Sequence, residues 1–269
     1  MKPPRHAAVV YGADDVRLDD PAELFHEASS FYPSFHRRQT PGAWSGNLEV
    51  LQALGSDGGK HFYEASSTAL PQPLEGEPTS LLALLERRVS SREFAPHPLA
   101  LDELATLLHA AQGVVGVAGD TGLPRRTAPS GGALYPLEAY VYAHRVAECD
   151  TGLFHYDPLQ HMLARMSAVP STDEVAAAFP HDELVRASAA VIVIGAMLWR
   201  SRFKYGIRAY RFALLEAGHA VQNVLLAAAA LGLHACPIGG FYDRLLNDLL
   251  GIDSVNEVAL YAVAVGRSV

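Results

Sequence analysis

The sequence predicts an α+β fold, and three observations support that prediction. Predicted strands and helices alternate irregularly along the chain, whereas a doubly wound parallel sheet requires regular alternation. Residues 189–196, AAVIVIGA, form a continuous apolar run that is typical of a strand buried on both faces. From Arg208 to Leu231, apolar residues recur at three- and four-residue steps, which predicts one long helix with a wide buried face formed by Leu214, Ala217, Val221, Val224, Leu225 and Ala228.

Composition and charge exclude several classes of protein. The chain has 269 residues, of which 49% are hydrophobic and 19% charged, so a sizeable core is expected and disorder as the main state is not. The net charge is −8, so no overall field attracts the protein to nucleic acid or anionic lipid. The two cysteines, Cys149 and Cys236, form neither a disulfide scaffold nor a metal-ligand pair by their spacing.

The chain shows no sign of membrane insertion or export. No segment reaches the roughly 18 apolar residues that a membrane span needs. The start of the chain, MKPPRHAAVVYGADDVRLDD, contains no long apolar run and soon becomes acidic, which excludes a secretory signal. We therefore expect a soluble cytoplasmic protein that does not bind membranes.

Two regions are distinguished by composition. Residues 1–78 lack sustained periodicity and end in a proline-rich stretch, LPQPLEGEPT, which predicts an N-terminal extension or arm followed by a linker. Residues 79–269 are predicted to form the folded domain. Aromatic side chains in the extension indicate that it packs against another surface: Phe25, Phe31, Tyr32, Phe35, Trp44, Phe62 and Tyr63.

The other elements follow from capping signals and short periodic runs. TSLLALLERR (79–88) offers a Thr or Ser N-cap, and LALDELATLLHAAQG (99–113) has two acidic residues in its first turn, so both are predicted helices. Residues 113–136 form a loop rich in Gly, Pro and Ser. The remaining predicted elements are strands at 139–146 and 152–157, a short helix at 199–206, a strand within 232–240, a helix at 241–251 and a closing strand at 257–266.

Common catalytic and metal motifs are absent. The glycines of residues 113–119 do not have the spacing of a dinucleotide fingerprint, and no phosphate loop ending in GK[ST] is present. His26 and Glu27 begin like a zinc-protease motif, but its second histidine would fall at Ser30. Ser130 lacks the Gly-x-Ser-x-Gly pattern of a hydrolase elbow. Because the twelve histidines are scattered, no metal site is predicted.

One candidate site is a cationic cluster in RRVSSREF (87–94). Arg88, Ser90 and Arg92 stand at every second position and form a cationic, hydroxyl-bearing cluster that can bind a phosphate. The alternative is that basic residues at this helix C-terminus only complement the helix dipole.

Two glycine pairs form further candidates. Pro129, Ser130, Gly131 and Gly132 would let the backbone approach a flat ligand closely and offer N–H donors to it, and Gly239–Gly240 at a strand end would do the same. Both could equally be ordinary turns. Arg267, at the end of the closing strand, would supply another phosphate contact or be a solvated terminal arginine.

The long helix and the segment before it complete the candidates. Glu216, His219, Gln222 and Asn223 form a polar stripe, which is either a solvated face or a site. Only three lysines occur, and just one, Lys204, lies beyond residue 60, directly before Tyr205. Lysine can be tuned as a base whereas arginine cannot, so the pair indicates chemistry, with an ordinary surface lysine as the alternative.

At these residues the sequence resembles the nitroreductase superfamily, and within it the SagB-type dehydrogenases, which oxidise azolines to azoles in thiazole/oxazole-modified peptides. The likeness runs from about Phe25 to Arg267 and is most specific in KYGIRAYRFALLEAGHAVQNVLLAAAALGL. It implies an α+β fold with a central mixed or antiparallel sheet flanked by helices. It also implies an FMN-binding domain at residues 79–269, a long core helix, and flavin at a homodimer interface.

The resemblance also implies roles for individual residues. Lys204 and Tyr205 match the Lys–Tyr pair that acts as catalytic base in azoline oxidases. Val89 departs from relatives that have a second basic residue there, which weakens the phosphate site slightly. The implied FMN contacts are Arg88, Ser90, Arg92 and Arg267 at the phosphate and ribityl chain, Pro129, Ser130, Gly131 and Gly132 along the isoalloxazine, Gly239 and Gly240 near its other edge, and Gln222 as a candidate contact.

The expected function is FMN-dependent oxidation of an azoline ring in a peptide, with hydride transfer to flavin N5, a Lys–Tyr base and reoxidation by dioxygen. Because no leader-recognition module is seen, we expect cyclodehydratase or carrier partners to supply the peptide. The alternatives are an NAD(P)H-dependent nitroreductase or flavin reductase, and a flavin-free scaffold subunit of a peptide-modifying complex. The ring type, the final base and the role of residues 1–78 stay open.

Overall fold

The central element is a seven-stranded sheet in the order β1-β6-β5-β4-β7-β9-β8. The computed structural model describes residues 21–30, 60, 62, 65–75, 79–119 and 122–269. All pairs of neighbouring strands in this sheet are antiparallel. The strands are β1 (Ser67–Ala69), β4 (Leu137–Ala143), β5 (Gly152–Asp157), β6 (Met162–Arg165), β7 (Ala190–Met197), β8 (Leu233–Ile238) and β9 (Glu257–Arg267).

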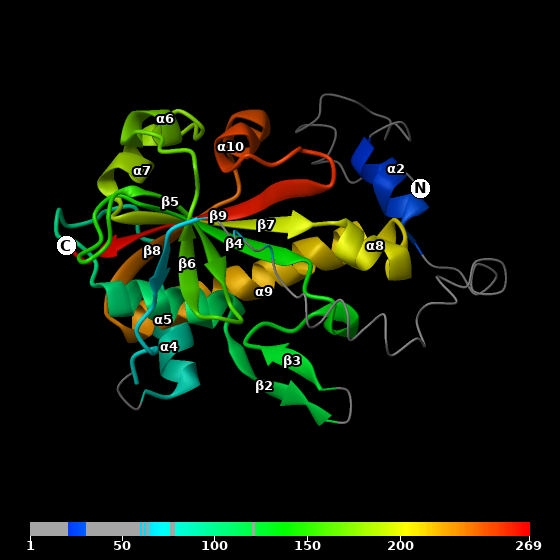
Figure 1. Ribbon diagram of the computed structural model, residues 1–269, viewed down its shortest axis with the longest axis horizontal. Helices are drawn as coiled ribbons and strands as arrows, with labels where there is room; N and C mark the ends of the chain where they lie inside the picture. Colours follow the sequence, from blue (N-terminus) through cyan, green and yellow to red (C-terminus); the bar gives the residue numbers. More distant parts are fainter. Residues whose placement is uncertain (1–20, 31–59, 61, 63–64, 76–78, 120–121) are drawn as a thin grey trace, which may run out of the picture.

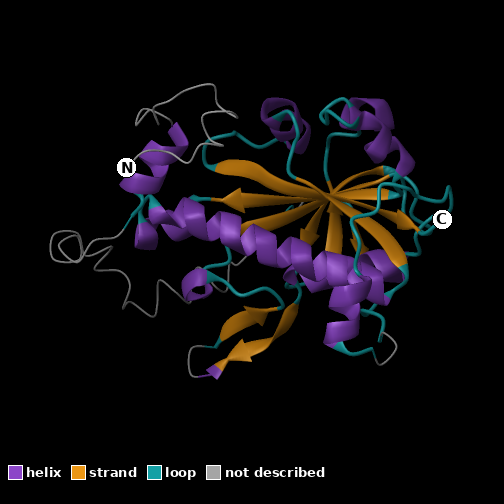
Figure 2. Ribbon diagram, turned by 180° about the vertical axis from the view of Figure 1, so that it is seen from behind, coloured by secondary structure: helices purple, strands orange, loops and turns teal. Residues whose placement is uncertain are grey.

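Helices cover both faces of the sheet, which confirms the predicted α+β fold (Figure 1). On one face lie α5 (Leu101–Gln112) and the long α9 (Arg208–Ala230), which runs across the strands (Figure 2). On the other face lie α6 (Thr172–Ala176), α7 (Asp182–Ala187) and α10 (Asp243–Leu250). Each face has its own cluster of buried apolar side chains, so the sheet is the middle layer of the core.

Elements with strong local signals form where the sequence predicts them. Helix α4 (Leu81–Arg87) begins after Ser80, whose hydroxyl accepts a hydrogen bond from the Ala83 N–H. The apolar run 189–196 forms the central strand β7, which is buried along almost its whole length. The short helix α8 (Trp199–Tyr205) precedes α9 and carries the Lys–Tyr pair.

The loop predicted at 113–136 contains ordered structure. Strands β2 (Val114–Ala118) and β3 (Leu123–Arg126) form a separate hairpin that projects from the body in both views. Three valines favour strand there, and Gly116 and Gly122 take positive φ values that permit the hairpin's bulge and turn. The strands β1 and β6, the helices α6 and α7, and α2 (Pro21–Ala28) are further elements without a sequence prediction.

The apolar face of α9 differs from the prediction at one position. Leu214, expected in that face, is 44% exposed, whereas Ala217, Val221, Val224, Leu225 and Ala228 are buried as predicted. Glu216, from the polar stripe, is buried, which excludes a solvated face at that position. Ala213 and Ala220 also face the core, and these small side chains let α9 pack closely on α5. By length and composition α9 could cross a membrane, contrary to the sequence estimate, but in this fold it is the core helix beneath the sheet.

The described parts of residues 1–78 pack against the same chain. The Phe25 ring of α2 contacts Tyr210 edge-on, Phe62 contacts His155, and β1 pairs with β6 at the sheet edge. The remaining aromatic residues predicted to pack lie outside the described residues: Phe31, Tyr32, Phe35, Trp44 and Tyr63.

Candidate functional site

The glycine turn and the Lys–Tyr pair lie in direct contact, although they come from distant parts of the chain. Gly131 and Gly132 begin the short 3₁₀ turn η2 (Gly131–Ala133), and Gly132 has a φ of +67°, which favours glycine. A β-carbon built on Gly132 would lie 2.6 Å from Tyr205 Oη and 2.7 Å from Lys204 Nζ. The polar ends of both side chains therefore meet at a position that any larger residue would occupy.

Helix α9 contacts both the Lys–Tyr pair and the glycine turn. The Tyr205 ring packs edge-on against Phe212, with 4.8 Å between ring centroids. The buried Glu216 carboxylate accepts a hydrogen bond of 2.9 Å from the Gly131 N–H. Burial raises the pKa of Glu216, although its bonds to the glycine turn and the charge of Arg126 oppose that shift. The first turns of α9 thus fix both the Lys–Tyr pair and the glycine turn.

A buried ion pair joins helix α8, which carries the Lys–Tyr pair, to strand β4, which follows the glycine turn. Arg200 of α8 pairs with Glu138 of β4, and both side chains are almost fully buried. The Glu138 carboxylate is also 2.6 Å from His155 Nε2. Burial alone would raise the pKa of Glu138, but the His155 hydrogen bond and the Arg200 charge lower it to about 2. Glu138 is therefore ionised, and the pair is charged.

The arginine cluster forms a second group of site residues, beside β8. Ser90 forms an isolated β-bridge with Ala235 of β8. The Arg88 guanidinium donates a hydrogen bond of 3.3 Å to the Ser90 hydroxyl. The side chains of Arg88 and Ser90 therefore lie close together, as expected for a cluster. A cavity of about 170 Å³ lies between this segment, the end of α9 and the start of β8.

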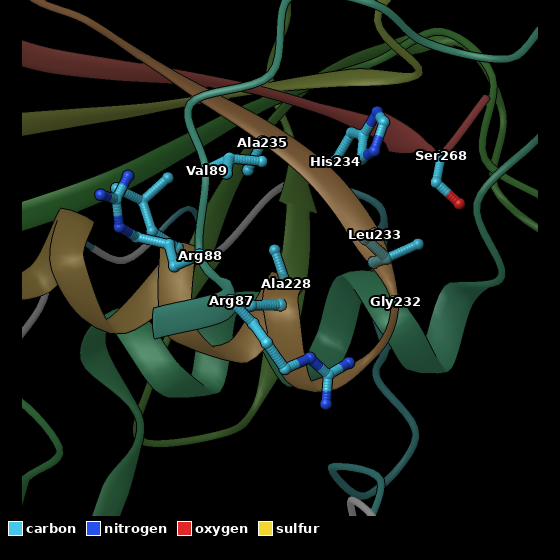
Figure 3. Close-up of a pocket in the computed structure, with 11 residues that line it drawn as sticks. Arg87, Arg88, Val89, Ala228, Gly232, Leu233, His234, Ala235 and Ser268 are labelled. Atoms are coloured by element: carbon cyan, nitrogen blue, oxygen red, sulfur yellow. The ribbon is translucent and has the colours of Figure 1, made fainter. Parts of the chain in front are cut away.

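Figure 3 shows that cavity with the guanidinium groups of Arg87 and Arg88 pointing away from one another, and His234 and Ser268 at its far end. Among the residues that the structure describes, neither Arg88 nor Arg92 forms an ion pair with an acid. Arg92 follows two residues after Ser90 and is exposed, and it is not among the residues that line the cavity. Arginines and a hydroxyl without a counter-ion are a suitable donor set for a phosphate. This group of residues therefore fits the phosphate end of a cofactor such as FMN.

The other residues predicted to contact the cofactor do not line this cavity. The Arg267 guanidinium pairs with Glu103 at 2.6 Å and donates to the Pro98 carbonyl, so a phosphate contact would require it to leave this pair. Gly239 and Gly240 are exposed at the end of β8, about 13 Å along the strand from Ala235. Gln222 is half-buried on α9, two turns before Ala229 of the cavity wall and therefore on the same helix face.

The site residues thus lie in two groups along α9. The glycine turn and the Lys–Tyr pair lie at Glu216, and the arginine cavity lies at Leu225, about 14 Å further along the helix. In the part of the chain that the structure describes, no cluster of three or more His, Cys, Asp or Glu residues could hold a metal ion.

Three supporting residues were not predicted as site residues in these roles. Glu216 was part of the polar stripe, but its bond to Gly131 could not be read from the helix alone. Glu138 and Arg200 carried a weaker signal: one acid inside the apolar strand LEAYVYA, and one arginine in the helix before Lys204. Buried charges within apolar elements require partners, which is the clue that they offered.

Comparisons with known proteins place the site in a family. The profile of the nitroreductase family matches residues 85–267, more than half of the chain. The chain belongs to the nitroreductase family. This nitroreductase-family chain is 35% identical to a protein of Methanocaldococcus jannaschii assigned to the nitroreductases, over 72% of this chain and 93% of that protein.

Two other relatives of this nitroreductase-family chain are named for peptide processing. One is the microcin B17-processing protein McbC of Escherichia coli, 32% identical over 50% of this chain and 51% of McbC. The other is the trifolitoxin-processing protein TfxB of Rhizobium leguminosarum, 28% identical over 64% of this chain and 48% of TfxB. The match spans about half the length of each of these two proteins.

Solved structures share the nitroreductase fold. A Ralstonia eutropha protein assigned to the nitroreductases has a TM-score of 0.62 and 25% identity, covering 78% of this chain and 92% of that one. A chain of the E. coli microcin synthetase McbBCD complex with truncated pro-MccB17 bound has a TM-score of 0.61 and 23% identity, covering 95% and 98%. These likenesses agree with the antiparallel sheet and flanking helices described above.

Proposed function

We propose that the protein is a SagB-type, FMN-dependent azoline oxidase that converts thiazoline or oxazoline rings in a peptide to the corresponding azoles. The observation that carries the proposal is the contact of the Lys204 amine and the Tyr205 hydroxyl with the same glycine turn. Membership of the nitroreductase family supports an oxidoreductase, and members of this family generally bind FMN. The names of McbC and TfxB support a peptide substrate.

Lys204 and Tyr205 are proposed to remove the proton of the reaction. Aromatising an azoline takes a hydride and a proton from the ring, so a base must be positioned beside the ring carbon that loses the proton. FMN, when bound, supplies the hydride acceptor, and dioxygen is the final oxidant, reduced to hydrogen peroxide. The Lys204 amine lies over the Tyr205 ring, 5.3 Å from the ring centroid, so the proposal assigns the proton to the pair and leaves open which of the two atoms receives it.

The two groups of site residues suggest how FMN is held. Arg88, Ser90 and Arg92 would bind the phosphate and ribityl chain, with Arg267 joining them if it leaves Glu103. The peptide backbone of Pro129–Gly132 and Gly239–Gly240 would lie against the flat ring system, because neither glycine pair has a side chain to exclude it. Gln222, between the two groups on α9, would contact the flavin.

A homodimer with flavin at the interface is also proposed. Helix α4 exposes Leu81, Leu82 and Leu85, and α9 exposes Leu214 and Leu215, which is typical of a surface covered by another subunit. Cyclodehydratase or carrier proteins would deliver the peptide, and the reaction would take place in the cytoplasm. Residues 1–78 are proposed as an extension on the FMN-binding domain of residues 79–269.

The test is to incubate the FMN-loaded protein aerobically with a thiazoline peptide and an oxazoline peptide. The expected product lacks two hydrogen atoms by mass spectrometry and appears together with hydrogen peroxide. Tyr205→Phe should lose this activity, and the exposed Tyr242→Phe should retain it. Full activity in both Lys204→Ala and Tyr205→Phe would refute the assignment of the base.

A second candidate is an NAD(P)H-dependent nitroreductase or flavin reductase. The observation that favours it is the match to a protein assigned to the nitroreductases across 93% of that protein's length. Such an enzyme would reduce a nitroaromatic compound with NADPH and would leave azoline peptides unchanged. The same preparation can be assayed for both reactions.

A further inference from the structure

Helix α8 carries the Lys–Tyr pair but has few means of its own to hold its position. It has seven residues, and its N-cap, Leu198, makes no side-chain capping bond. Helices of this length are marginal in isolation, so their geometry is determined by tertiary contacts. Whatever fixes α8 therefore also fixes the Lys204 amine and the Tyr205 hydroxyl.

Arg200 makes the buried polar contacts of α8 with the glycine-turn side of the site. Its guanidinium pairs with the Glu138 carboxylate and donates to the Tyr135 carbonyl at 3.5 Å. It is 5% exposed, and Glu138 is 3% exposed, so water does not compete for these bonds. Glu138 is held in turn by His155, which is fully buried on the neighbouring strand β5.

The contacts of Arg200 connect two segments that both lie next to the Lys–Tyr pair. Arg200 lies one helical turn before Lys204 on the same helix. Tyr135 and Glu138 lie three and six residues after Gly132, at the end of the glycine turn and the start of β4. One guanidinium therefore connects the two segments whose meeting places the Lys204 amine and the Tyr205 hydroxyl against Gly132.

We infer that Arg200 is a positioning residue that fixes α8 against the glycine turn through Glu138 and the Tyr135 carbonyl, and so places Lys204 and Tyr205. This inference deepens the proposed function, because the pair that it positions is the proposed base. The competing explanation is that the ion pair only stabilises the fold. Removing one partner of a buried pair leaves an uncompensated charge, so a single substitution does not separate the two explanations.

The decisive variant is the double substitution Arg200→Met/Glu138→Gln. Methionine replaces the arginine stem, and glutamine can still bond to His155, so neither member of the Arg200–Glu138 pair is left charged without its partner. The exposed arginine of α7, substituted as Arg186→Met, is the matched control. Thermal unfolding shows whether each variant keeps the wild-type fold.

Two measurements on the cofactor-free protein then report on position. Hydrogen exchange of residues 199–205 should become about tenfold faster in the double variant, whereas exchange in the central strand β7 stays as in the wild type. The rate at which acetic anhydride acetylates Lys204, measured relative to the rate for Lys60 in the same sample, should also change. Unchanged exchange and unchanged Lys204 labelling in a folded double variant would overturn the inference.

Activity provides a third measurement, and it separates this inference from the proposed function. With azoline peptide, kcat should fall about 100-fold while the Kd for FMN is unchanged, because a misplaced base slows only the chemical step. If the wild type does not oxidise azolines, the proposed function fails, and exchange and labelling still decide the role of Arg200. If the double variant does not fold, Arg200→Lys, which retains the charge but not the planar fork, takes its place in the same measurements.

Discussion

The two ends of the candidate site use charge in opposite ways. In the arginine cluster, Arg88 is half-buried and Arg92 is exposed, and within the described residues neither has an acidic partner. At the glycine turn, Glu138, Arg200 and Glu216 are buried, and each is bonded to a neighbouring element. This contrast supports the proposal that the arginines bind a ligand, whereas the buried charges hold neighbouring elements in place.

That contrast follows from the cost of burying ions. An exposed arginine keeps its hydration until a phosphate replaces it, so it can remain unpaired in the ligand-free protein. A buried ion must be paired within the fold, and its pair then restricts the elements on which it stands. Substitutions at the two ends should therefore affect different measurements, namely FMN affinity at one end and turnover or stability at the other.

The largest effect is expected for the Lys–Tyr pair. Lys204→Ala should lower azoline oxidation by about 10²- to 10⁴-fold, the usual contribution of a general base, because the proton of the ring then has no acceptor. FMN should still bind, since Lys204 lies at the other end of the site from the arginines. Steady-state turnover and a flavin titration measure the two quantities; normal turnover by both Lys204→Ala and Tyr205→Phe would show that the base lies elsewhere.

The next effect concerns the stability that the buried carboxylate confers. The pKa of Glu138 is about 2 in the folded protein against 4.5 in its ordinary state, so folding favours the ionised form. Its contribution, on the order of 3 kcal/mol, is present above pH 4.5 and is lost as the pH falls towards 2. Denaturant unfolding of the wild type should therefore weaken with acid over this range more steeply than that of Glu138→Gln. Parallel pH curves for the two proteins would contradict this role of Glu138.

A smaller effect is expected at the arginine cavity. Arg88→Ala and Arg92→Ala should each weaken FMN binding by about 10- to 100-fold, because a hydrogen bond to a charged group contributes about 1.5–3 kcal/mol. At saturating FMN, kcat should stay near the wild-type value. Arg244→Ala, an exposed arginine on α10, is the control and should bind FMN normally. Unchanged FMN affinity in both variants would remove the arginine cluster from the cofactor site.

The smallest effect is expected for Gly132→Ala. Its φ of +67° costs an alanine about 1–2 kcal/mol, and the new methyl group would displace the Lys204 and Tyr205 side chains. The free energy of unfolding and kcat should both fall, whereas Gly218→Ala, with nothing within 4 Å of its β-carbon, should be at least as stable as the wild type. Wild-type turnover in Gly132→Ala would mean that the contact with the Lys–Tyr pair is not needed for catalysis.

The elements that could be predicted from the sequence are those with strong local signals. The cap at Ser80, the apolar run of β7 and the periodicity of α9 predict elements that the structure confirms. The hairpin β2–β3 was not predicted, because its glycines and prolines also fit a loop. Short strands such as β1 depend on pairing across the sheet, which the local sequence does not encode.

The candidate site was predictable where residue type and spacing carry chemistry, as in Arg88-x-Ser90 and Lys204–Tyr205. The contacts that hold these residues in place were not predictable, because they join residues far apart in the chain. Arg200 and Glu138 are separated by 62 positions, and Glu216 and Gly131 by 85. Helical periodicity suggested a solvated or site-lining face for Glu216, and only the packing of α9 under the glycine turn shows which of these holds.

The most direct test of azoline oxidation is an anaerobic reduction of the purified, FMN-loaded protein, followed by its visible spectrum. An azoline peptide should bleach the flavin absorbance, and NADPH should not. Prompt bleaching by NADPH, with no response to azoline peptides, would contradict the azoline-oxidase assignment and favour the nitroreductase alternative. A protein that stays colourless after FMN is added would contradict both enzyme assignments and leave a flavin-free scaffold subunit.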